Sequence, residues 1–253
     1  MAANVALSQA LAYARDLKNL YEVARVREEE TVHAHNKLRA AYQQSLAYAV
    51  DLKTTHRRLQ RSILQSLLGL ANALEAKDEY TRGHSDRVAA LARRLALEAG
   101  LTVRQADVIA QSGLLHDLGK IGVPEHILRK SGPLTQEEWA VMRRHPVTGS
   151  QIVAPLESFA EGALIVRHHH EREDGSGYPD GLSGETIPLG ARVVAVADVY
   201  DALTSERPYR RALTHAEALE RLTAEAGRTL DARLTRLFTD MVAHAPPDWP
   251  VRD

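Results

Sequence analysis

The sequence predicts an all-α protein, and three observations lead to this expectation. Aromatic residues make up only 5% of the 253 residues, and no segment shows the strong alternation of apolar and polar residues that is typical of half-buried strands. Four segments carry the capping-box pattern, in which side chains at a helix start satisfy free backbone N–H groups. From residue 4 to residue 76 the chain has no proline and only one glycine, Gly69.

Composition and charge limit the classes of function that the protein can have. The formal net charge of -1 argues against a nucleic-acid duplex as the main partner, because proteins that bind phosphate backbones usually carry a basic excess. Small anionic ligands need only a local cluster of positive charge. The chain has no cysteine, so a metal would be held by His, Asp or Glu. We expect a cytoplasmic protein, because no apolar run approaches the about 18–20 residues of a membrane helix and no secretory signal is present.

Residues 1–60 predict a helical stalk. The segment LAYARDLK at 11–18 recurs as LAYAVDLK at 46–53, with seven of eight positions identical and an offset of 35 residues, which is five heptads. Both copies therefore lie in the same phase of a coiled coil, and we expect this coiled coil to dimerise the protein. The alternative is a helical hairpin whose turn is the polar segment 25–36.

Residues 61–253 predict shorter helices with clear starts and stops. A helix is expected over 82–99, where Gly100 acts as its stop. The capping-box patterns place further helix starts near residues 103, 136, 159 and 215. Another helix is expected over about 190–204, and Asp231 is expected to cap the last one.

Histidines and aspartates carry the pattern of a metal site. Seven of the twelve histidines fall between residues 84 and 170. His116 and Asp117 are neighbours at a helix end, and adjacent side chains on a helix point about 100° apart, so the carboxylate can bridge two ions. A solvated polar residue is the ordinary alternative for any single histidine. Together, however, six or seven N and O donors suit two borderline metal ions about 3.5–4 Å apart with a bridging water or hydroxide. These donors are His84, His116, Asp117, His145, His169, His170 and Asp198.

Four motifs resemble the HD-GYP subfamily of the HD phosphohydrolase superfamily. They are HDLGK at 116–120, RHPVTG at 144–149, HHEREDGSGYP at 169–179 and ADVYDALTSERPYR at 197–210. The resemblance covers about 61–253 and leaves the stalk outside. It implies an HD-type helical bundle with a C-terminal helical extension that carries the GYP motif. It also implies two or three iron or manganese ions and hydrolysis of cyclic di-GMP to pGpG and, in some members, GMP.

The resemblance also implies roles for single residues. It makes the seven donors the metal ligands, with Asp117 as the bridge. Lys120 would reach a phosphate oxygen of the substrate, so Asp117 and Lys120 are the expected catalytic residues. Tyr178, Arg207 and Arg210 would bind the substrate, the two arginines through phosphate or guanine contacts.

Two residues are expected to support the metal ligands, and one position differs from the pattern of the family. Asp201 and Glu171 would hold the ligands from outside the metal shell. Some members carry a Glu four residues before the first histidine that ligates a third metal, but here this position is Tyr80. A phenol with a pKa near 10 is neutral at pH 7 and a poor ligand. We therefore expect two divalent ions, Fe or Mn.

The sequence thus predicts a metal-dependent phosphodiesterase that hydrolyses cyclic di-GMP by a metal-bridging hydroxide. One alternative is a phosphodiesterase for another cyclic dinucleotide. Another is a catalytically silent module that binds cyclic di-GMP or recruits partners through the loop 174–181. The expected partners are cyclic di-GMP, a second copy bound through the N-terminal helix, and a diguanylate cyclase at the GYP loop. Neither DNA nor a membrane is expected as a partner.

Overall fold

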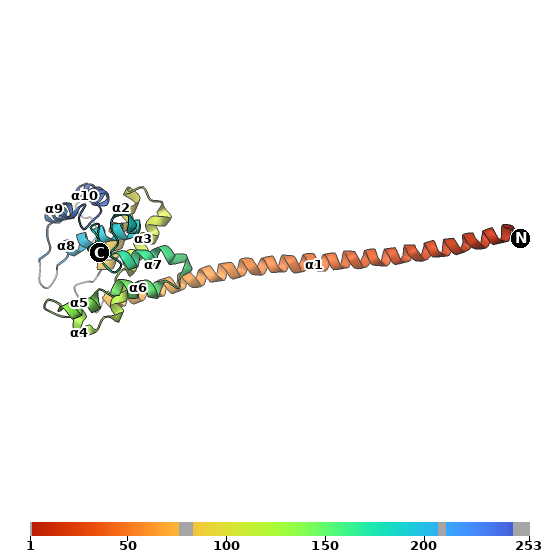
Figure 1. Ribbon diagram of the computed structural model, residues 1–253, viewed down its shortest axis with the longest axis horizontal. Coiled ribbons are helices and arrows are strands. Elements are labelled where there is room, and N and C mark those ends of the chain that lie inside the picture. The colour runs from red at the N-terminus through yellow and green to blue at the C-terminus, as the bar shows by residue number, and fades with distance from the viewer. Residues whose placement is uncertain (1, 76–82, 207–210, 245–253) are drawn as a thin grey trace. The chain divides into compact units, whose positions relative to one another are not determined.

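The computed structural model describes residues 2–75, 83–206 and 211–244, and these residues are all-α (Figure 1). No β-sheet is present among them, and the one isolated bridge joins Ala226 and Leu230. The all-α expectation is confirmed. None of the helices in these three ranges combines the length and the apolar character that a membrane crossing requires.

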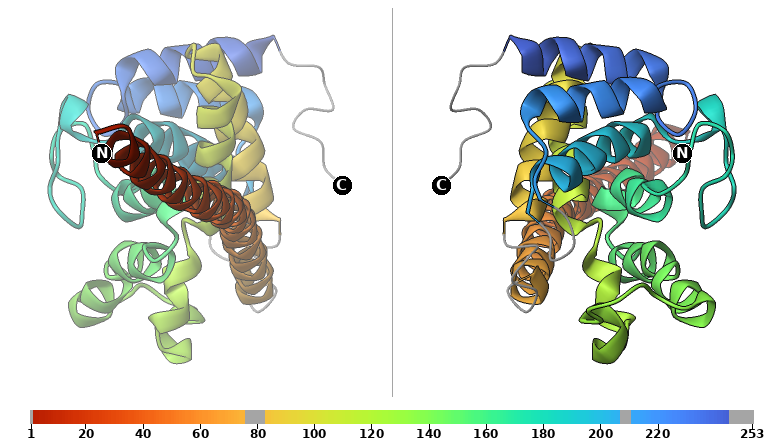
Figure 2. Two further views of the ribbon diagram at one scale, coloured as in Figure 1. Left: turned by 90° about the vertical axis from the view of Figure 1, so that its right-hand side faces the viewer. Right: turned by 90° about the vertical axis from the view of Figure 1, so that its left-hand side faces the viewer.

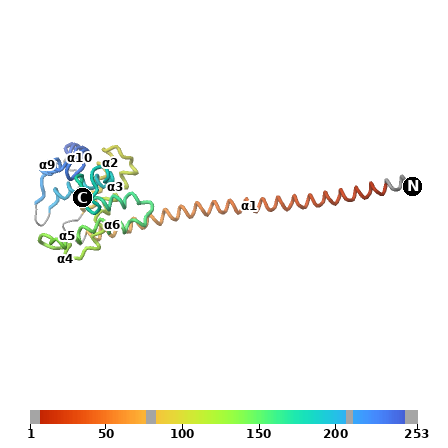
Figure 3. Tube along the Cα trace, viewed as in Figure 1, coloured from red at the N-terminus to blue at the C-terminus, as the bar shows by residue number. Residues whose placement is uncertain are grey.

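Helix α1 runs without interruption from Ala2 to Glu75, as the trace in Figure 3 shows. The polar segment 25–36 lies inside this helix, so the helical-hairpin alternative is wrong. The segment contains many polar residues but no proline or glycine, and polar residues alone do not break a helix. Backbone contacts divide the chain into two compact units, residues 1–59 and residues 60–253.

The unit 60–253 contains the end of α1 and a set of shorter helices. Its α-helices are α2 (His84–Glu98), α3 (Val103–Leu115), α4 (Glu125–Leu128), α5 (Gln136–Met142), α6 (His145–Val153), α7 (Ala160–His168), α8 (Leu189–Thr204), α9 (His215–Glu225) and α10 (Ala232–Ala243). Three short 3-10 helices connect them: η1 (Leu118–Gly122), η2 (Glu157–Phe159) and η3 (Gly184–Thr186). In Figure 2 the dark blue helix α10 packs beside the yellow α2 and beside the blue α9.

Two hydrophobic clusters hold these helices together. The larger one joins α2, α3, α7, α8, α9 and α10 through fully buried side chains such as Leu91, Ile109 and Phe238. The smaller one joins η1, α6 and α7 around Leu118 and Phe159, and the last turns of α1 cover it with Ala71 and neighbouring leucines. The helix ends that carry the histidines are therefore fixed by apolar packing on either side of them.

Side-chain caps are present at the starts of α3, α5, α9 and α10. Thr102, Thr135 and Thr214 each form the expected capping box, so the predicted starts of α3, α5 and α9 are confirmed. Asp231 accepts a hydrogen bond from the backbone N of Leu234 at 2.8 Å, which confirms it as the cap of α10.

The helix start predicted near residue 159 is confirmed to within one residue, but its predicted cap is wrong. Its proposed cap, Ser158, lies inside η2, and α7 begins at Ala160 with Phe159 as an N-cap that makes no side-chain hydrogen bond. Phe159 is only 3% exposed in the smaller cluster. Its burial therefore outweighs a local cap by Ser158, because removing a phenyl ring from water stabilises more than one exposed hydrogen bond.

Candidate metal centre

The structure brings all seven predicted donors together. They form three groups, and within each group one ligand atom per residue lies within 4.8 Å of the others. Two histidines belong to two groups each, so the groups form one continuous cluster. The groups are His84, His116 and Asp198; His116, Asp117 and His169; and His145, His169 and His170.

Helix ends supply most of these donors. His84 and His145 are the first residues of α2 and α6, and His116 and His169 are the C-caps of α3 and α7. A helix end can aim a side chain along the helix axis, so several helices can converge on a small volume. Asp198 is the exception, since it lies within α8.

A glycine brings η1 against α6. A Cβ atom on Gly119 would collide with the backbone carbonyl of His145, so only glycine permits this approach. The close approach places Asp117 between two histidines. One carboxylate oxygen lies 3.4 Å from Nε2 of His116, and the other lies 3.3 Å from Nε2 of His145. Each oxygen of Asp117 therefore faces a different imidazole, which is the arrangement a bridging carboxylate needs.

Three of the imidazoles have a fixed tautomer. Each lies with Nδ1 within hydrogen-bond distance of the backbone carbonyl three residues earlier, and a carbonyl can only accept. In the neutral form of each ring, Nδ1 therefore carries the hydrogen and Nε2 carries the lone pair, on the side of the cluster. The pairs are His116 with Gly113 at 2.6 Å, His145 with Met142 at 2.8 Å and His169 with Val166 at 2.7 Å.

His84 is oriented by a carboxylate instead. Its Nδ1 lies 2.7 Å from Oδ2 of Asp201, and its Nε2 lies 3.4 Å from Oδ1 of Asp198. Asp201 is 2% exposed and also accepts hydrogen bonds from Nε and a terminal nitrogen of Arg87, at 2.6 and 3.0 Å. The sequence predicted that Asp201 supports a metal ligand, but the role of Arg87 was not predicted. The available signal was that Arg87 lies three residues after His84, on the same helix face.

The electrostatics of the cluster keep the carboxylates charged. Burial raises the pKa of Asp117, but Lys120 and His116 outweigh it and hold this pKa well below its usual range. For Asp198, burial is likewise outweighed by His84 and His116, and its pKa falls. Burial lowers the pKa of His170 to about 3, so this imidazole is neutral at pH 7. Anionic carboxylates and neutral imidazoles are the forms that bind metal ions.

His84 behaves differently from His170. Burial lowers its pKa, but hydrogen bonds to Asp198 and Asp201 outweigh burial and raise the pKa to about 10. A metal ion at Nε2 would therefore compete with a proton held by two carboxylates.

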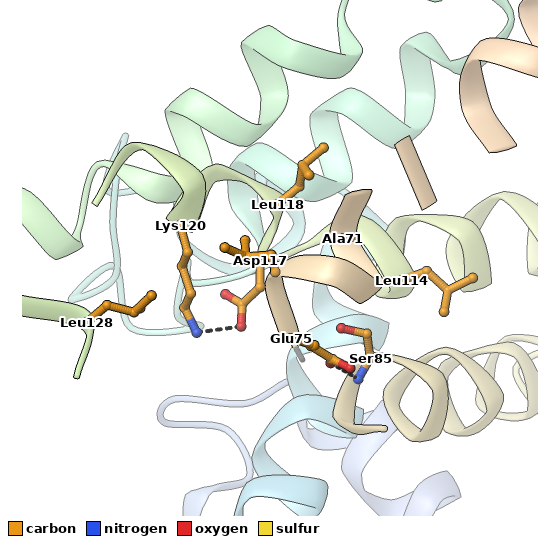
Figure 4. Close-up of a pocket in the computed structure, with 9 residues that line it drawn as sticks. Ala71, Glu75, Ser85, Leu114, Asp117, Leu118, Lys120 and Leu128 are labelled. Carbon is orange, nitrogen blue, oxygen red and sulfur yellow. Dashed lines mark hydrogen bonds and ion pairs between the residues drawn. The ribbon is translucent and has the colours of Figure 1, made fainter. Parts of the chain in front are cut away.

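A pocket adjoins the cluster, and Figure 4 shows its lining. Nζ of Lys120 points at Oδ2 of Asp117, 2.5 Å away. On another side of the pocket, Oε1 of Glu75 accepts a hydrogen bond from the backbone N of Ser85 at 2.6 Å. Helix α2 has no side-chain cap at Gly83, so Glu75 supplies an acceptor for the N-terminus of the helix that presents His84. No local sequence pattern predicts this contact, because Glu75 and Ser85 are ten residues apart in the sequence and lie in different helices.

The loop after His170 is held by a buried carboxylate. Glu171 is 4% exposed and accepts hydrogen bonds from three successive backbone N–H groups. They belong to Asp180, Gly181 and Leu182, at 2.7, 3.1 and 3.1 Å. Glu171 therefore fixes the loop beside the cluster.

Tyr178 lies against the cluster. Its ring centroid is 4.8 Å from that of His170, and its backbone N donates to the carbonyl of His170 at 3.2 Å. A Cβ atom on Gly177 would collide with backbone atoms of residues 170–172, so a glycine is needed beside Tyr178. Arg207, Arg210 and Tyr80 lie outside the described residues, and their expected roles stay predictions.

The fold and the donor set define an all-helical protein with a histidine- and aspartate-rich centre for divalent metal ions. Residues 69–234 match the family model described as HD domain. The chain belongs to this family, in its HD-GYP branch.

Two curated relatives from this branch are named for different cyclic dinucleotide substrates. The cyclic di-GMP phosphodiesterase response regulator RpfG of Xanthomonas campestris is 42% identical over 193 residues, which are 76% of this chain and 51% of the relative. The 3'3'-cGAMP-specific phosphodiesterase 2 of Vibrio cholerae is 38% identical over 193 residues, which are 76% of this chain and 36% of the relative. The chain thus spans about half the length of these relatives or less.

A solved structure supports the fold. Bd1817, an HDG"Y"P protein from Bdellovibrio bacteriovorus, aligns with a TM-score of 0.53 and 24% identity. The alignment covers 63% of this chain and 51% of that chain.

Proposed function

We propose that this protein is a metal-dependent phosphodiesterase that hydrolyses cyclic di-GMP to pGpG, with GMP as the product if the second phosphodiester is cleaved as well. The observation that carries the proposal is the continuous cluster of five histidines and two aspartates, which lie in α2, α6 and α8 or directly follow α3 and α7. The similarity to RpfG, which is named a cyclic di-GMP phosphodiesterase, supports the choice of substrate.

The donor set fits two divalent ions, and we propose iron or manganese. Imidazole nitrogens and carboxylates without thiolates suit these metals. Asp117, whose two oxygens face His116 and His145, is the proposed bridge between the ions. When bound, two such ions stabilise charge on a phosphodiester and lower the pKa of water.

The other residues of the chain would bind and orient the substrate. Lys120 lines the pocket beside Asp117, where its ammonium group can donate to a phosphate oxygen. Tyr178 borders the cluster at His170. Arg207 and Arg210 are proposed to clamp a phosphate or a guanine. Replacing either by Ala should raise the Michaelis constant by about tenfold or more without changing metal content.

A second candidate substrate has a specific observation behind it. The similarity to the 3'3'-cGAMP-specific phosphodiesterase 2 favours a mixed guanine–adenine cyclic dinucleotide. A catalytically silent binding module is less well supported, because binding alone has no chemical need for seven converging metal donors.

We also propose that residues 1–60 are a stalk that forms a homodimer, and that residues 61–253 are the catalytic domain. Leu17, Leu38 and Leu52 are separated by whole heptads and form part of the predicted seam of the coiled coil. Within the unit 1–59 they are 58%, 69% and 71% exposed. A single helix gains little stability in water, and a second copy would bury this stripe. A diguanylate cyclase is a proposed partner of the loop 174–181, where Asp174 and Ser176 are exposed.

One experiment tests the proposed function. The protein is purified anaerobically, its metal content is measured, and products from cyclic di-GMP and 3'3'-cGAMP are separated by chromatography. We expect pGpG from cyclic di-GMP, and the chromatogram shows whether GMP follows. Faster turnover of 3'3'-cGAMP would favour the second substrate, and fully metal-loaded protein that cleaves neither would contradict a phosphodiesterase.

A further inference from the structure

An arginine between two aromatic rings lies beside the metal cluster. Cζ of Arg143 is 5.8 Å from the ring centroid of Trp139 and 5.6 Å from that of Tyr178. Both distances are within the range of a cation–π contact. Trp139 lies on α5 and is 45% exposed, and Arg143 is the exposed C-cap of the same helix. Within the described residues, Arg143 forms no ion pair with a carboxylate.

Tyr178 connects this arginine to the cluster. One side of the tyrosine borders His170, at 4.8 Å between centroids, and Arg143 lies over its ring. The nearby charges include the carboxylates of Asp117 and Asp198 as well as Arg143 and Arg172. His170, Tyr178, Arg143 and Trp139 thus form a continuous path that leads from a proposed metal ligand to solvent. A cyclic dinucleotide is larger than its scissile phosphate, so one of its bases has to extend along the rim of the cluster.

We propose that Arg143 reads a guanine base of the substrate, and that Trp139 and Tyr178 hold its guanidinium group in place. The inference rests on the proposed function and deepens it. Contacts with two rings restrict where the guanidinium group can lie, so its N–H donors stay in one place for a ligand. Two such donors match O6 and N7 of guanine, whereas adenine presents an N6 amino donor at the matching position. Arg143 therefore favours guanine over adenine.

A phosphate is the other ligand that a guanidinium group recognises. The flanking rings favour the base, because a phosphate can accept from many directions and needs no fixed plane of donors. The two possibilities differ in their consequences. Loss of a base contact changes the preference among substrates, whereas loss of a phosphate contact weakens all of them alike.

The test compares cyclic di-GMP, 3'3'-cGAMP and cyclic di-AMP on the metal-loaded full-length protein. We expect Arg143→Ala to reduce the ratio of kcat/KM for cyclic di-GMP over cyclic di-AMP by on the order of tenfold. Arg144→Ala is the matched control, since Arg144 is the neighbouring exposed arginine and has no ring contact among the described residues. The rate with bis(p-nitrophenyl) phosphate, which has no base, should stay unchanged in both variants.

Two substitutions of Trp139 provide a second measurement. Trp139→Leu should lose part of the same guanine preference, and Trp139→Phe should restore most of it, because a phenyl ring still covers the guanidinium. Equal losses for all three dinucleotides in Arg143→Ala, or an unchanged ratio, would overturn the inference while leaving the proposed function intact. If the unmodified protein cleaves no phosphodiester, the proposed function fails. The ratio of calorimetric affinities for cyclic di-GMP and cyclic di-AMP, with and without Arg143→Ala, then decides the inference separately.

Discussion

Leucines of residues 1–59 are exposed to water, whereas four of the five histidines in the metal cluster of residues 60–253 are buried. Leu38 and Leu52 are 69% and 71% exposed, but His116 and His169 are each 1% exposed. Exposed apolar stripes are stabilised by another apolar surface, and buried imidazoles and carboxylates by compensating charge. This difference is the basis of the proposals that the first unit binds another helix and that the second unit binds cations.

The largest expected effect is in the second unit. Asp117→Ala should abolish metal binding and turnover, because the two cations lose the anion that faces both groups of ligands. Helical content, measured by circular dichroism, should remain near that of the unmodified protein, and so should the dimer. Asp107→Ala is the control, since Asp107 is an exposed aspartate of α3 paired with Arg93. An Asp117→Ala protein that kept its ions and rate would show that the metal assignment is wrong.

The opposite result is expected in the first unit, where a change should remove the dimer and leave the metal ions in place. Removal of residues 1–59, or the seam substitution Leu52→Glu, should convert the dimer to a monomer and leave the metal content unchanged. Val50→Glu is the matched control, because Val50 is 67% exposed but lies outside the predicted seam. Light scattering over a range of concentrations measures the result. A full-length protein that stays monomeric at high concentration would contradict the stalk.

A smaller effect is expected at the carboxylate behind His84. Asp201→Ala removes the acceptor of His84 Nδ1, 2.7 Å away, and should weaken metal affinity by about 10–100-fold. Asp201→Asn keeps one oxygen acceptor and should lose less. Metal affinities can be compared by competition with a chelator. Equal affinity in the Ala variant would show that Arg87 and Asp201 stabilise the fold without orienting the ligand.

The smallest effect is expected at the end of α1. Glu75→Ala removes the acceptor for the backbone N of Ser85 and should lower the free energy of unfolding by about 1 kcal/mol. Glu75→Gln keeps an acceptor and should cost less. Urea denaturation followed by circular dichroism measures both changes, and a larger cost for Gln than for Ala would exclude the capping account.

What the sequence predicted correctly was local. Thr102, Thr135 and Thr214 cap helices through residues three positions away, so the pattern contains both partners. The cap predicted for α7 was wrong because burial of Phe159 depends on packing against distant segments.

The same distinction between local patterns and distant contacts applies to the candidate site. Its donors could be named because histidine and aspartate are chemically distinctive, and because the four motifs resemble those of a family. Contacts such as Glu75 with Ser85, or Arg143 with Tyr178, have no such signal. They join segments whose proximity follows only from the complete fold.

The central claim is that the buried cluster performs metal-dependent hydrolysis of a cyclic dinucleotide. The most direct measurement is an anaerobic titration of metal-free protein with Mn²⁺ or Fe²⁺, in which hydrolysis of cyclic di-GMP is followed against bound metal. The account predicts no turnover without metal and a rate that saturates at two ions per chain. Turnover that persists in metal-free protein, or that never appears with both sites filled, would contradict it.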